Sequence, residues 1–194
     1  MPAYDAKTAL IVVDVQNDFA DSNGGLYVRD GEAVIPIING EIQAASERGG
    51  LVVYTQDWHP GSTPHFQKDG GIWPVHCVQG TWGAELHPNL NVIGEVVRKG
   101  AGGEDGYSGF TVRDPRTGEE HGTGLEELLR RRGTERVVVA GLATDYCVKE
   151  TAVDAARKNF DTTVMTSAVR AVDLQEGDGE RALEAVAAAG GHLE

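Results

Sequence analysis

The sequence predicts an α/β domain of three layers, in which helices cover both faces of a mostly parallel central sheet of about six strands. Short runs of apolar and β-branched residues, typical of strands buried on both faces, alternate along the chain with longer segments of helical periodicity. The chain has 194 residues and shows no internal repeat and no low-complexity segment. We therefore expect a single domain over residues 1–194, with Rossmann-like layering.

The strands are predicted from runs of Val, Ile and Leu. The candidates are 9–13, 51–55, 92–98, 136–140 and 162–166. The most strand-like of them is the Arg136-Val137-Val138-Val139-Ala140 run. The chain end looks short for a further strand, which leaves the last edge of the sheet open, and Leu193-Glu194 is also consistent with a cloning remnant.

The helices are predicted from apolar residues at helical spacing. They cover 32–48, the segment from Thr123 to the Arg130–Arg132 run, the segment from Val148 to Ala156, and 180–189. Pro36 is tolerable in the first turn of its helix, and Thr123 is a candidate N-cap. Residues 58–77 are rich in Pro, Gly and aromatic side chains, which is typical of a long functional loop.

Composition narrows the classes of partner. A formal net charge of -13 argues against nucleic acid and anionic membrane surfaces, both of which require a basic surface, so a small-molecule substrate is expected. Only two cysteines are present, which favours a reducing, cytoplasmic setting. The first residues lack the order of a signal peptide, and no apolar run reaches the ~18 residues of a membrane span.

Three residues that each follow a predicted strand are the candidate catalytic group. Cys147 lies where a buried strand leads into a helix, a position that favours the thiolate, although a free cysteine can also be a small buried hydrophobe. Asp14 and Lys99 follow two other strands, and the carboxyl ends of parallel strands meet at one edge of a sheet. Asp14 can accept the thiol proton and Lys99 can stabilise the thiolate, whereas each alone is also consistent with an ordinary surface residue.

A second group of residues suits a metal ion. Asp57 and His59 are two apart on an extended segment and so share a face, and His65 and His76 follow in the adjoining loop. One carboxylate with three imidazoles suits Zn²⁺, Fe²⁺ or Mn²⁺, and structural histidines are the alternative. Cys77 is either a further ligand or, as we favour, a buried structural thiol. The other histidines lack such neighbours and are expected at the surface: His87, His121 and His192.

Six motifs occur in order over nearly the whole chain: V-D-V-Q-N-D-F at 13–19, D-W-H-P-G-S-T-P-H-F at 57–66, W-P-V-H-C at 73–77, R-K-G at 98–100, Y-S-G-F at 107–110 and G-L-A-T-D-Y-C-V at 141–148. Together they resemble the nicotinamidase/pyrazinamidase family within the isochorismatase-like cysteine hydrolases. The resemblance implies hydrolysis of nicotinamide, and of pyrazinamide, through a thioester in NAD salvage. It implies an Asp14, Lys99 and Cys147 triad.

The resemblance also implies one divalent metal ion, which orients the pyridine nitrogen of the substrate. Its implied ligands are Asp57, His59, His65 and His76. Related amidohydrolases and isochorismatases of this fold generally lack these ligands, so the histidines narrow the substrate. A metal-free amidohydrolase acting on another small amide and a non-catalytic ligand-binding relative are the alternatives. The number of subunits stays open, a homo-oligomer included.

The pocket is also implied by the resemblance. An oxyanion hole is expected from the N–H groups of Ala143 and Cys147, with a cis peptide between Leu142 and Ala143. The implied substrate contacts are Phe19, Trp73, Tyr107 and Leu142. For Tyr107, ordinary core packing is an equal alternative. The Gly-rich and acidic segment 100–106 has no assigned role.

Overall fold

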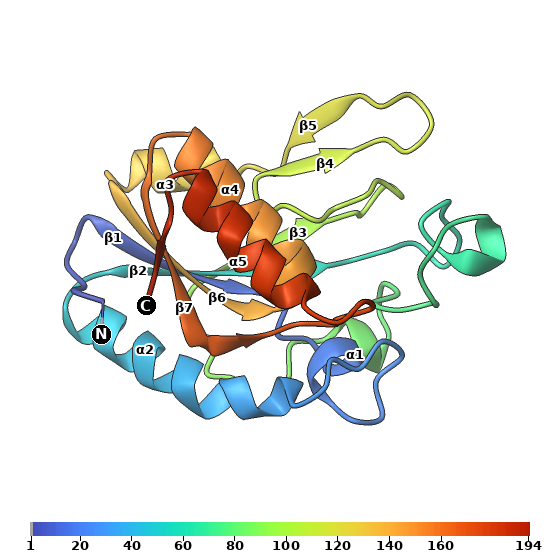
Figure 1. Ribbon diagram of the computed structural model, residues 1–194, viewed down its shortest axis with the longest axis horizontal. Helices are drawn as coiled ribbons and strands as arrows, with labels where there is room; N and C mark the ends of the chain where they lie inside the picture. Colours follow the sequence, from blue (N-terminus) through green and yellow to red (C-terminus); the bar gives the residue numbers. More distant parts are fainter. Residues whose placement is uncertain (1) are drawn as a thin grey trace.

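The computed structural model describes residues 2–194 and confirms the three-layer α/β/α architecture (Figure 1). Six parallel strands form the central sheet in the order β3-β2-β1-β6-β7-β8. In chain order these strands are β1 Thr8–Val13, β2 Leu51–Asp57, β3 Glu95–Lys99, β6 Arg136–Leu142, β7 Asp161–Arg170 and β8 His192–Leu193.

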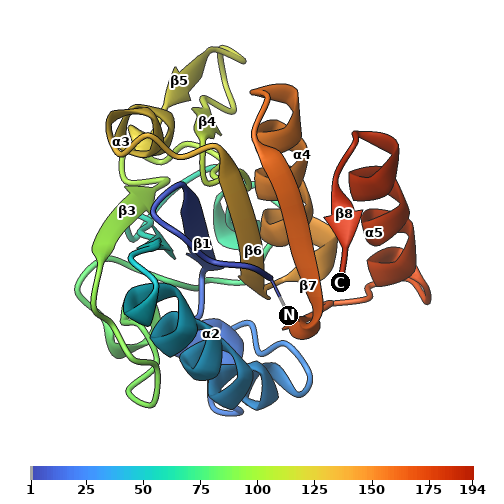
Figure 2. The same cartoon turned by 90° about the vertical axis from the view of Figure 1, so that its left-hand side faces the viewer.

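Helices cover both faces of this sheet (Figure 2). Helix α2 (Ile35–Glu47) packs on one face, and α3 (Leu125–Arg131), α4 (Lys149–Arg157) and α5 (Asp178–Ala188) pack on the other. Alternate residues of β1 serve the two cores, since Leu10 and Val12 contact the α2 side while Ile11 and Val13 contact the opposite side. Both faces of the strands are therefore buried, which explains their unbroken apolar sequence.

Shorter elements complete the chain. They are α1 Asn17–Ala20, the 3₁₀ turns η1 Gly31–Val34, η2 Gln67–Asp69 and η3 Trp82–Ala84, the π-helical turn η4 Thr144–Val148, and the antiparallel strands β4 Thr111–Arg113 and β5 Glu120–Gly122. The β4–β5 hairpin projects beyond the layers in Figure 1. Within residues 2–194, no helix has the length and apolarity that crossing a membrane requires.

The strand order places a switch point at the carboxyl ends of β1 and β6. The chain builds the sheet outward from β1 through β2 to β3, and then returns to the other side of β1 with β6. Ligands of open α/β sheets bind where the strand order reverses in this way. Glycine is required at position 141 of β6, where the strand passes close to β1. Its φ is 123°, and a Cβ there would lie only 2.1 Å from the carbonyl oxygen of Val13.

Some sequence expectations were wrong. The sheet edge that the sequence left open is formed by β8, where Leu193 pairs with Val164. His87 is buried, not at the surface, and its Nδ1 accepts a hydrogen bond from the N–H of Asn89 at 3.2 Å. Thr123 is not the N-cap of α3, because the helix begins at Leu125 and Gly124 holds the cap position; the Thr123 hydroxyl, one residue earlier, accepts the N–H of Leu125 at 3.2 Å.

Candidate active site and metal centre

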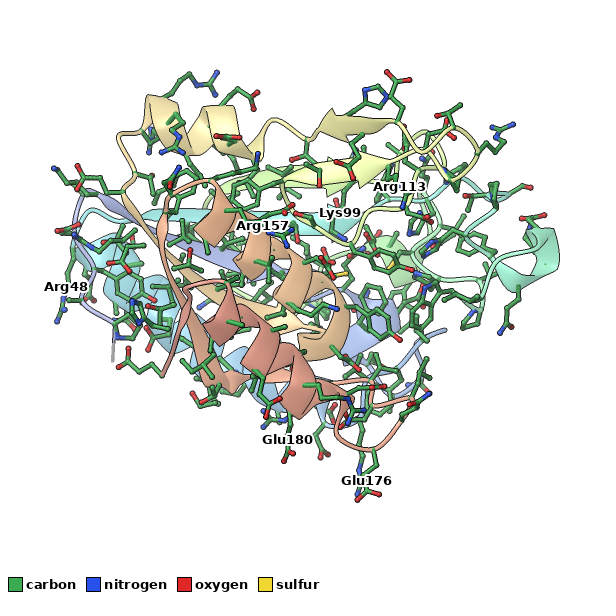
Figure 3. All side chains as sticks on the ribbon, turned by 45° about the horizontal axis from the view of Figure 1, so that its top comes forward. Arg48, Lys99, Arg113, Arg157, Glu176 and Glu180 are labelled. Atoms are coloured by element: carbon green, nitrogen blue, oxygen red, sulfur yellow. The ribbon has the colours of Figure 1, made fainter. Side chains whose placement is uncertain are left out.

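Asp14, Lys99 and Cys147 meet at the carboxyl edge of the sheet. Asp14 directly follows β1, Lys99 is the last residue of β3, and Cys147 lies in η4 after β6. The Lys99 Nζ is 2.7 Å from Asp14 Oδ2 and 3.6 Å from Cys147 Sγ. Figure 3 shows Lys99 in the interior, whereas Arg48 and Glu176 project from the molecule. The predicted convergence of three strand ends is thus present.

Lys99 is held by more than this pair. Its ammonium also donates to Asp57 Oδ1 and to the carbonyl oxygen of Gly106. Asp57 is the register partner of Lys99, because β2 runs two residues beyond its predicted end and places Asp57 beside Lys99 on the neighbouring strand. The other oxygen of Asp14 accepts the hydroxyl of Thr55 at 2.6 Å. Acceptors from Asp14, Asp57 and the Gly106 carbonyl thus surround the Lys99 ammonium.

Burial controls the protonation of this group. Burial raises the pKa of the Cys147 thiol well above its usual value, and the neighbouring Lys99 charge opposes that rise. Burial likewise raises the pKa of Asp14, again opposed by Lys99. For Asp57 burial acts in the same direction, but Lys99 and His59 outweigh it, so its pKa lies well below the usual range. One ammonium cannot neutralise two carboxylates and a thiolate, so the thiol and Asp14 compete for a proton.

The backbone around Cys147 has the predicted form. The peptide bond between Leu142 and Ala143 is cis. Ala143 then precedes η4, and its carbonyl oxygen accepts the N–H groups of Tyr146 and Val148, each at 3.1 Å. Ala143 and Cys147 both line the cavity described below, which is the position that donors to an oxyanion require.

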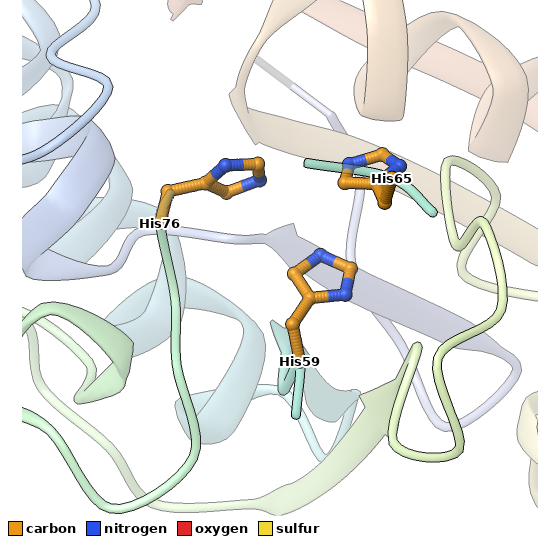
Figure 4. A group of neighbouring side chains, drawn as sticks. All are labelled: His59, His65 and His76. Atoms are coloured by element: carbon orange, nitrogen blue, oxygen red, sulfur yellow. The ribbon is translucent and has the colours of Figure 1, made fainter. Parts of the chain in front are cut away.

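His59, His65 and His76 converge from separate segments of the 57–77 loop region, as Figure 4 shows. One ring nitrogen from each lies within 4.8 Å of those of the other two, and all three residues are buried. The Nε2 of His59 is 3.6 Å from Asp57 Oδ2. Asp57 therefore lies between the two groups, with one oxygen toward Lys99 and the other toward the histidines.

The hydrogen bonds of the histidines fit a bound cation. His65 Nδ1 is 2.7 Å from Asp105, and His76 Nδ1 is 2.7 Å from the carbonyl oxygen of Pro74. In residues 2–194 neither ring nitrogen of His59 has a hydrogen-bond partner, although both are buried. Burial also lowers the pKa of His65, and that of His76 to about 4, which keeps both imidazoles neutral and able to ligate. Orphaned buried nitrogens are costly, and a metal ion would satisfy one of the two.

A cavity of about 410 Å³, including its opening, lies between the two groups. Three of the predicted substrate contacts, Phe19, Trp73 and Tyr107, line it. Trp73 Nε1 donates to the Tyr107 hydroxyl at 2.8 Å, and the Trp73 ring packs edge-on against Tyr146 with centroids 4.8 Å apart. The Leu142 side chain, in contrast, is fully buried in the α2-side core and is not among the lining residues. The walls suit a flat aromatic ring.

Several lining residues were not predicted from the sequence. They are Leu26, Val28, Gly106, Tyr146 and Val172. Tyr146 carried a usable signal, since it directly precedes Cys147 in the predicted nucleophile turn. The others come from loops, and nothing in their local sequence indicates that they approach the cavity. Cys77 is buried and unpaired and is not part of the histidine cluster, in agreement with its predicted structural role.

The segment 100–106, unassigned from sequence, wraps around both groups. Gly100, at a φ of 73°, packs so tightly that a Cβ would lie 2.7 Å from the His59 ring. The carbonyl of Gly106 accepts the Lys99 ammonium, and Asp105 contacts His65. Gly100 is thus required by its close approach to the histidine cluster.

Comparison with known proteins agrees with this geometry. The isochorismatase domain family matches residues 8–193. The chain is 36% identical over 203 residues to the nicotinamidase of Escherichia coli, covering 95% of this chain and 93% of that protein. It superposes on the zinc complex of Pyrococcus horikoshii pyrazinamidase with a TM-score of 0.86 at 39% identity, covering 97% and 98% of the two chains. For an L. infantum protein in complex with nicotinate the TM-score is 0.90 at 35% identity, covering 100% and 95%.

Proposed function

Because this chain belongs to the isochorismatase family, we propose that it is a metal-dependent cysteine amidohydrolase that converts nicotinamide to nicotinate and ammonia. The observation that carries the proposal is one cavity lined both by the buried Cys147 and by three histidines, with Asp57 in contact with Lys99 and His59. Pyrazinamide presents the same carboxamide on a similar ring and is proposed as a second substrate.

Asp57, His59, His65 and His76 would hold one divalent cation, either zinc, iron or manganese. When bound, the cation would anchor and orient the ring nitrogen of the substrate. A fixed ring nitrogen restricts where the carboxamide can lie, and Cys147 lines the same cavity as the histidines. The aromatic wall of Trp73 and Tyr107 holds the ring by stacking and excludes water.

The reaction we propose has two halves. In the first, the Cys147 proton moves to Asp14 and the sulfur bonds to the carboxamide carbon, while the N–H groups of Ala143 and Cys147 hold the developing oxyanion. Asp14 then returns the proton to the leaving nitrogen, the C–N bond breaks, and ammonia departs. In the second half, Asp14 takes a proton from water, which attacks the thioester carbon; the C–S bond breaks and the proton returns to the sulfur. Nicotinic acid leaves and loses its own proton to solvent, which gives nicotinate.

Lys99 has an electrostatic role in this scheme. Its ammonium is 3.6 Å from the sulfur and 2.7 Å from Asp14, so it stabilises whichever of the two carries the negative charge. That exchange lets the proton move between them while the total charge around Lys99 stays constant. The two unpaired cysteines also suit a reducing compartment, and we propose a cytoplasmic location.

The test is ammonia release from nicotinamide by purified protein of known metal content. We expect turnover by the wild type, loss of turnover after chelation, and recovery when zinc, iron or manganese is returned. Cys147→Ala should reduce turnover by at least about 10⁴-fold while metal content stays the same. Wild-type protein that carries metal and releases no ammonia from nicotinamide or pyrazinamide would overturn the proposal.

A further inference from the structure

The three histidines of the cluster differ in the hydrogen-bond partners of their ring nitrogens. The Nδ1 of His65 contacts the Asp105 carboxylate at 2.7 Å, and that of His76 contacts the neutral carbonyl of Pro74, also at 2.7 Å. His59 has no such partner in residues 2–194. Of the three, His65 is the one whose ring hydrogen-bonds a carboxylate in residues 2–194, since Asp57 lies 3.6 Å from His59 Nε2. The Asp105 side chain retains 31% exposure, whereas the His65 ring retains 5%.

This contact fixes the tautomer of His65. An ionised carboxylate accepts hydrogen bonds and cannot donate one, so Nδ1 of the neutral ring must carry the proton. The lone pair then lies on Nε2, on the far side of the ring from Asp105. A carboxylate behind a ligating imidazole both orients the ring and raises its basicity toward a metal ion.

The backbone of Asp105 is held by a pair of hydrogen bonds to Arg113. Its N–H donates to the carbonyl of Arg113 and its carbonyl accepts the N–H of Arg113, both at 2.8 Å. Arg113 is the last residue of β4, so the β4–β5 hairpin fixes the backbone position from which the Asp105 side chain extends. Nearby, the Thr63 hydroxyl donates to the carbonyl of Gly103 at 2.8 Å and ties the segment to the loop that carries His65.

We propose that Asp105 is a positioning residue that sets the metal affinity of the site through His65, and that the β4–β5 hairpin serves to hold it there. The inference rests on the metal centre of the proposed function and adds a residue outside the ligand set. It also gives segment 100–106 a definite task. Asp105 touches neither the cavity centre nor the sulfur, so its effect passes through the imidazole.

Two variants and one control test this inference. Asp105→Ala removes the acceptor, and Asp105→Asn keeps an acceptor oxygen but removes the charge. Glu104→Gln is the matched control, because it removes the neighbouring charge while its amide oxygen can still accept the N–H of Gly102, as Glu104 does at 2.8 Å. Zn²⁺ affinity is measured by competition with a chromophoric chelator, and the visible spectrum of Co²⁺-loaded protein reports ligand geometry.

We expect Asp105→Ala to bind Zn²⁺ about 10–100-fold more weakly than the wild type, with Asp105→Asn in between. Glu104→Gln should stay within about twofold, as for other partly exposed charges. The Co²⁺ spectrum should change in both Asp105 variants and not in the control. Thermal melting of the metal-free proteins separates a loss of metal affinity from a loss of fold. The melting temperature should stay near that of the wild type, since the backbone bonds between Asp105 and Arg113 are untouched. If the Ala variant does not fold, the measurement is made on Asp105→Asn.

Wild-type Zn²⁺ affinity and an unchanged Co²⁺ spectrum in the Asp105 variants would overturn the inference. Ammonia release distinguishes the two proposals. If the wild type hydrolyses nicotinamide and the variants bind metal normally, only the role of Asp105 is wrong. If the variants lose metal affinity but the wild type hydrolyses neither amide, only the proposed reaction is wrong.

Discussion

The triad and the histidine cluster line the same cavity, yet they are held together in opposite ways. Lys99 lies between the carboxylates of Asp14 and Asp57, so the buried charges of the triad compensate one another within the protein. In the cluster, the two ring nitrogens of His59 are buried and have no partner in residues 2–194. The triad is therefore complete in the chain alone, whereas the cluster would be completed by the proposed cation.

This difference predicts where each half is vulnerable. Removal of Lys99 should destabilise the fold itself, because it leaves the carboxylates of Asp14 and Asp57 buried without their cation. Removal of a cluster residue should chiefly affect metal binding. Asp57 belongs to both halves and is the one position at which the two effects should coincide.

The largest expected effect is at Lys99. Lys99→Met leaves two buried carboxylates without their cation, so the free energy of unfolding of the metal-free protein should fall by about 3–5 kcal/mol in a urea titration. The matched control is Lys68→Met, which breaks an ion pair with Asp69 whose lysine is 44% exposed and should cost at most about 1 kcal/mol. Equal, small losses in both variants would contradict the view that the buried charges hold the triad.

A smaller effect on fold, but a clear one on metal, is expected at His59. His59→Ala should lose the bound metal and reduce nicotinamide turnover by about 10²-fold or more, because the pyridine ring of the substrate is no longer positioned. Added Zn²⁺ should raise the melting temperature of the wild type and not of this variant. His121→Ala, an exposed histidine of β5, is the control and should behave as the wild type. Full zinc stabilisation of His59→Ala would show that the cluster is not the metal site.

The smallest effect is expected at the aromatic wall that joins the two halves. Tyr107→Phe removes the hydroxyl that accepts Trp73 Nε1, a net loss of roughly 0.5–1.5 kcal/mol. We expect a rise in KM of about 2–10-fold with little change in kcat, measured by steady-state ammonia release. Tyr27→Phe, which breaks a bond to Glu32 at the surface, is the control. An unchanged KM would favour the alternative that Tyr107 only packs.

The same comparison explains what the sequence could predict. Strand runs such as 136–140 are buried on both faces, so their apolar pattern identified the sheet, and residues placed just after strands identified the triad. The histidines were found because they fall close together in one loop. Both predictions used information that lies within a few residues of each site residue.

The features that were missed depend on long-range contacts. Strand β8 has two residues and exists only because β7 offers it an edge. The burial of His87 depends on packing that no local pattern records. Asp105 reaches His65 across 40 positions in the sequence, through a hairpin that is itself polar and showed no strand signal. Cavity residues from loops, such as Val172, are of the same kind.

The central claim is that Cys147 attacks the amide carbon and carries the acyl group. The most direct measurement is peptide mass spectrometry of metal-loaded protein that is acid-quenched during turnover of nicotinamide. We predict a nicotinoyl group on the peptide that contains Cys147, removable by hydroxylamine and absent from Cys147→Ala. An acyl group on any other residue, or wild-type turnover by Cys147→Ala, would contradict the account.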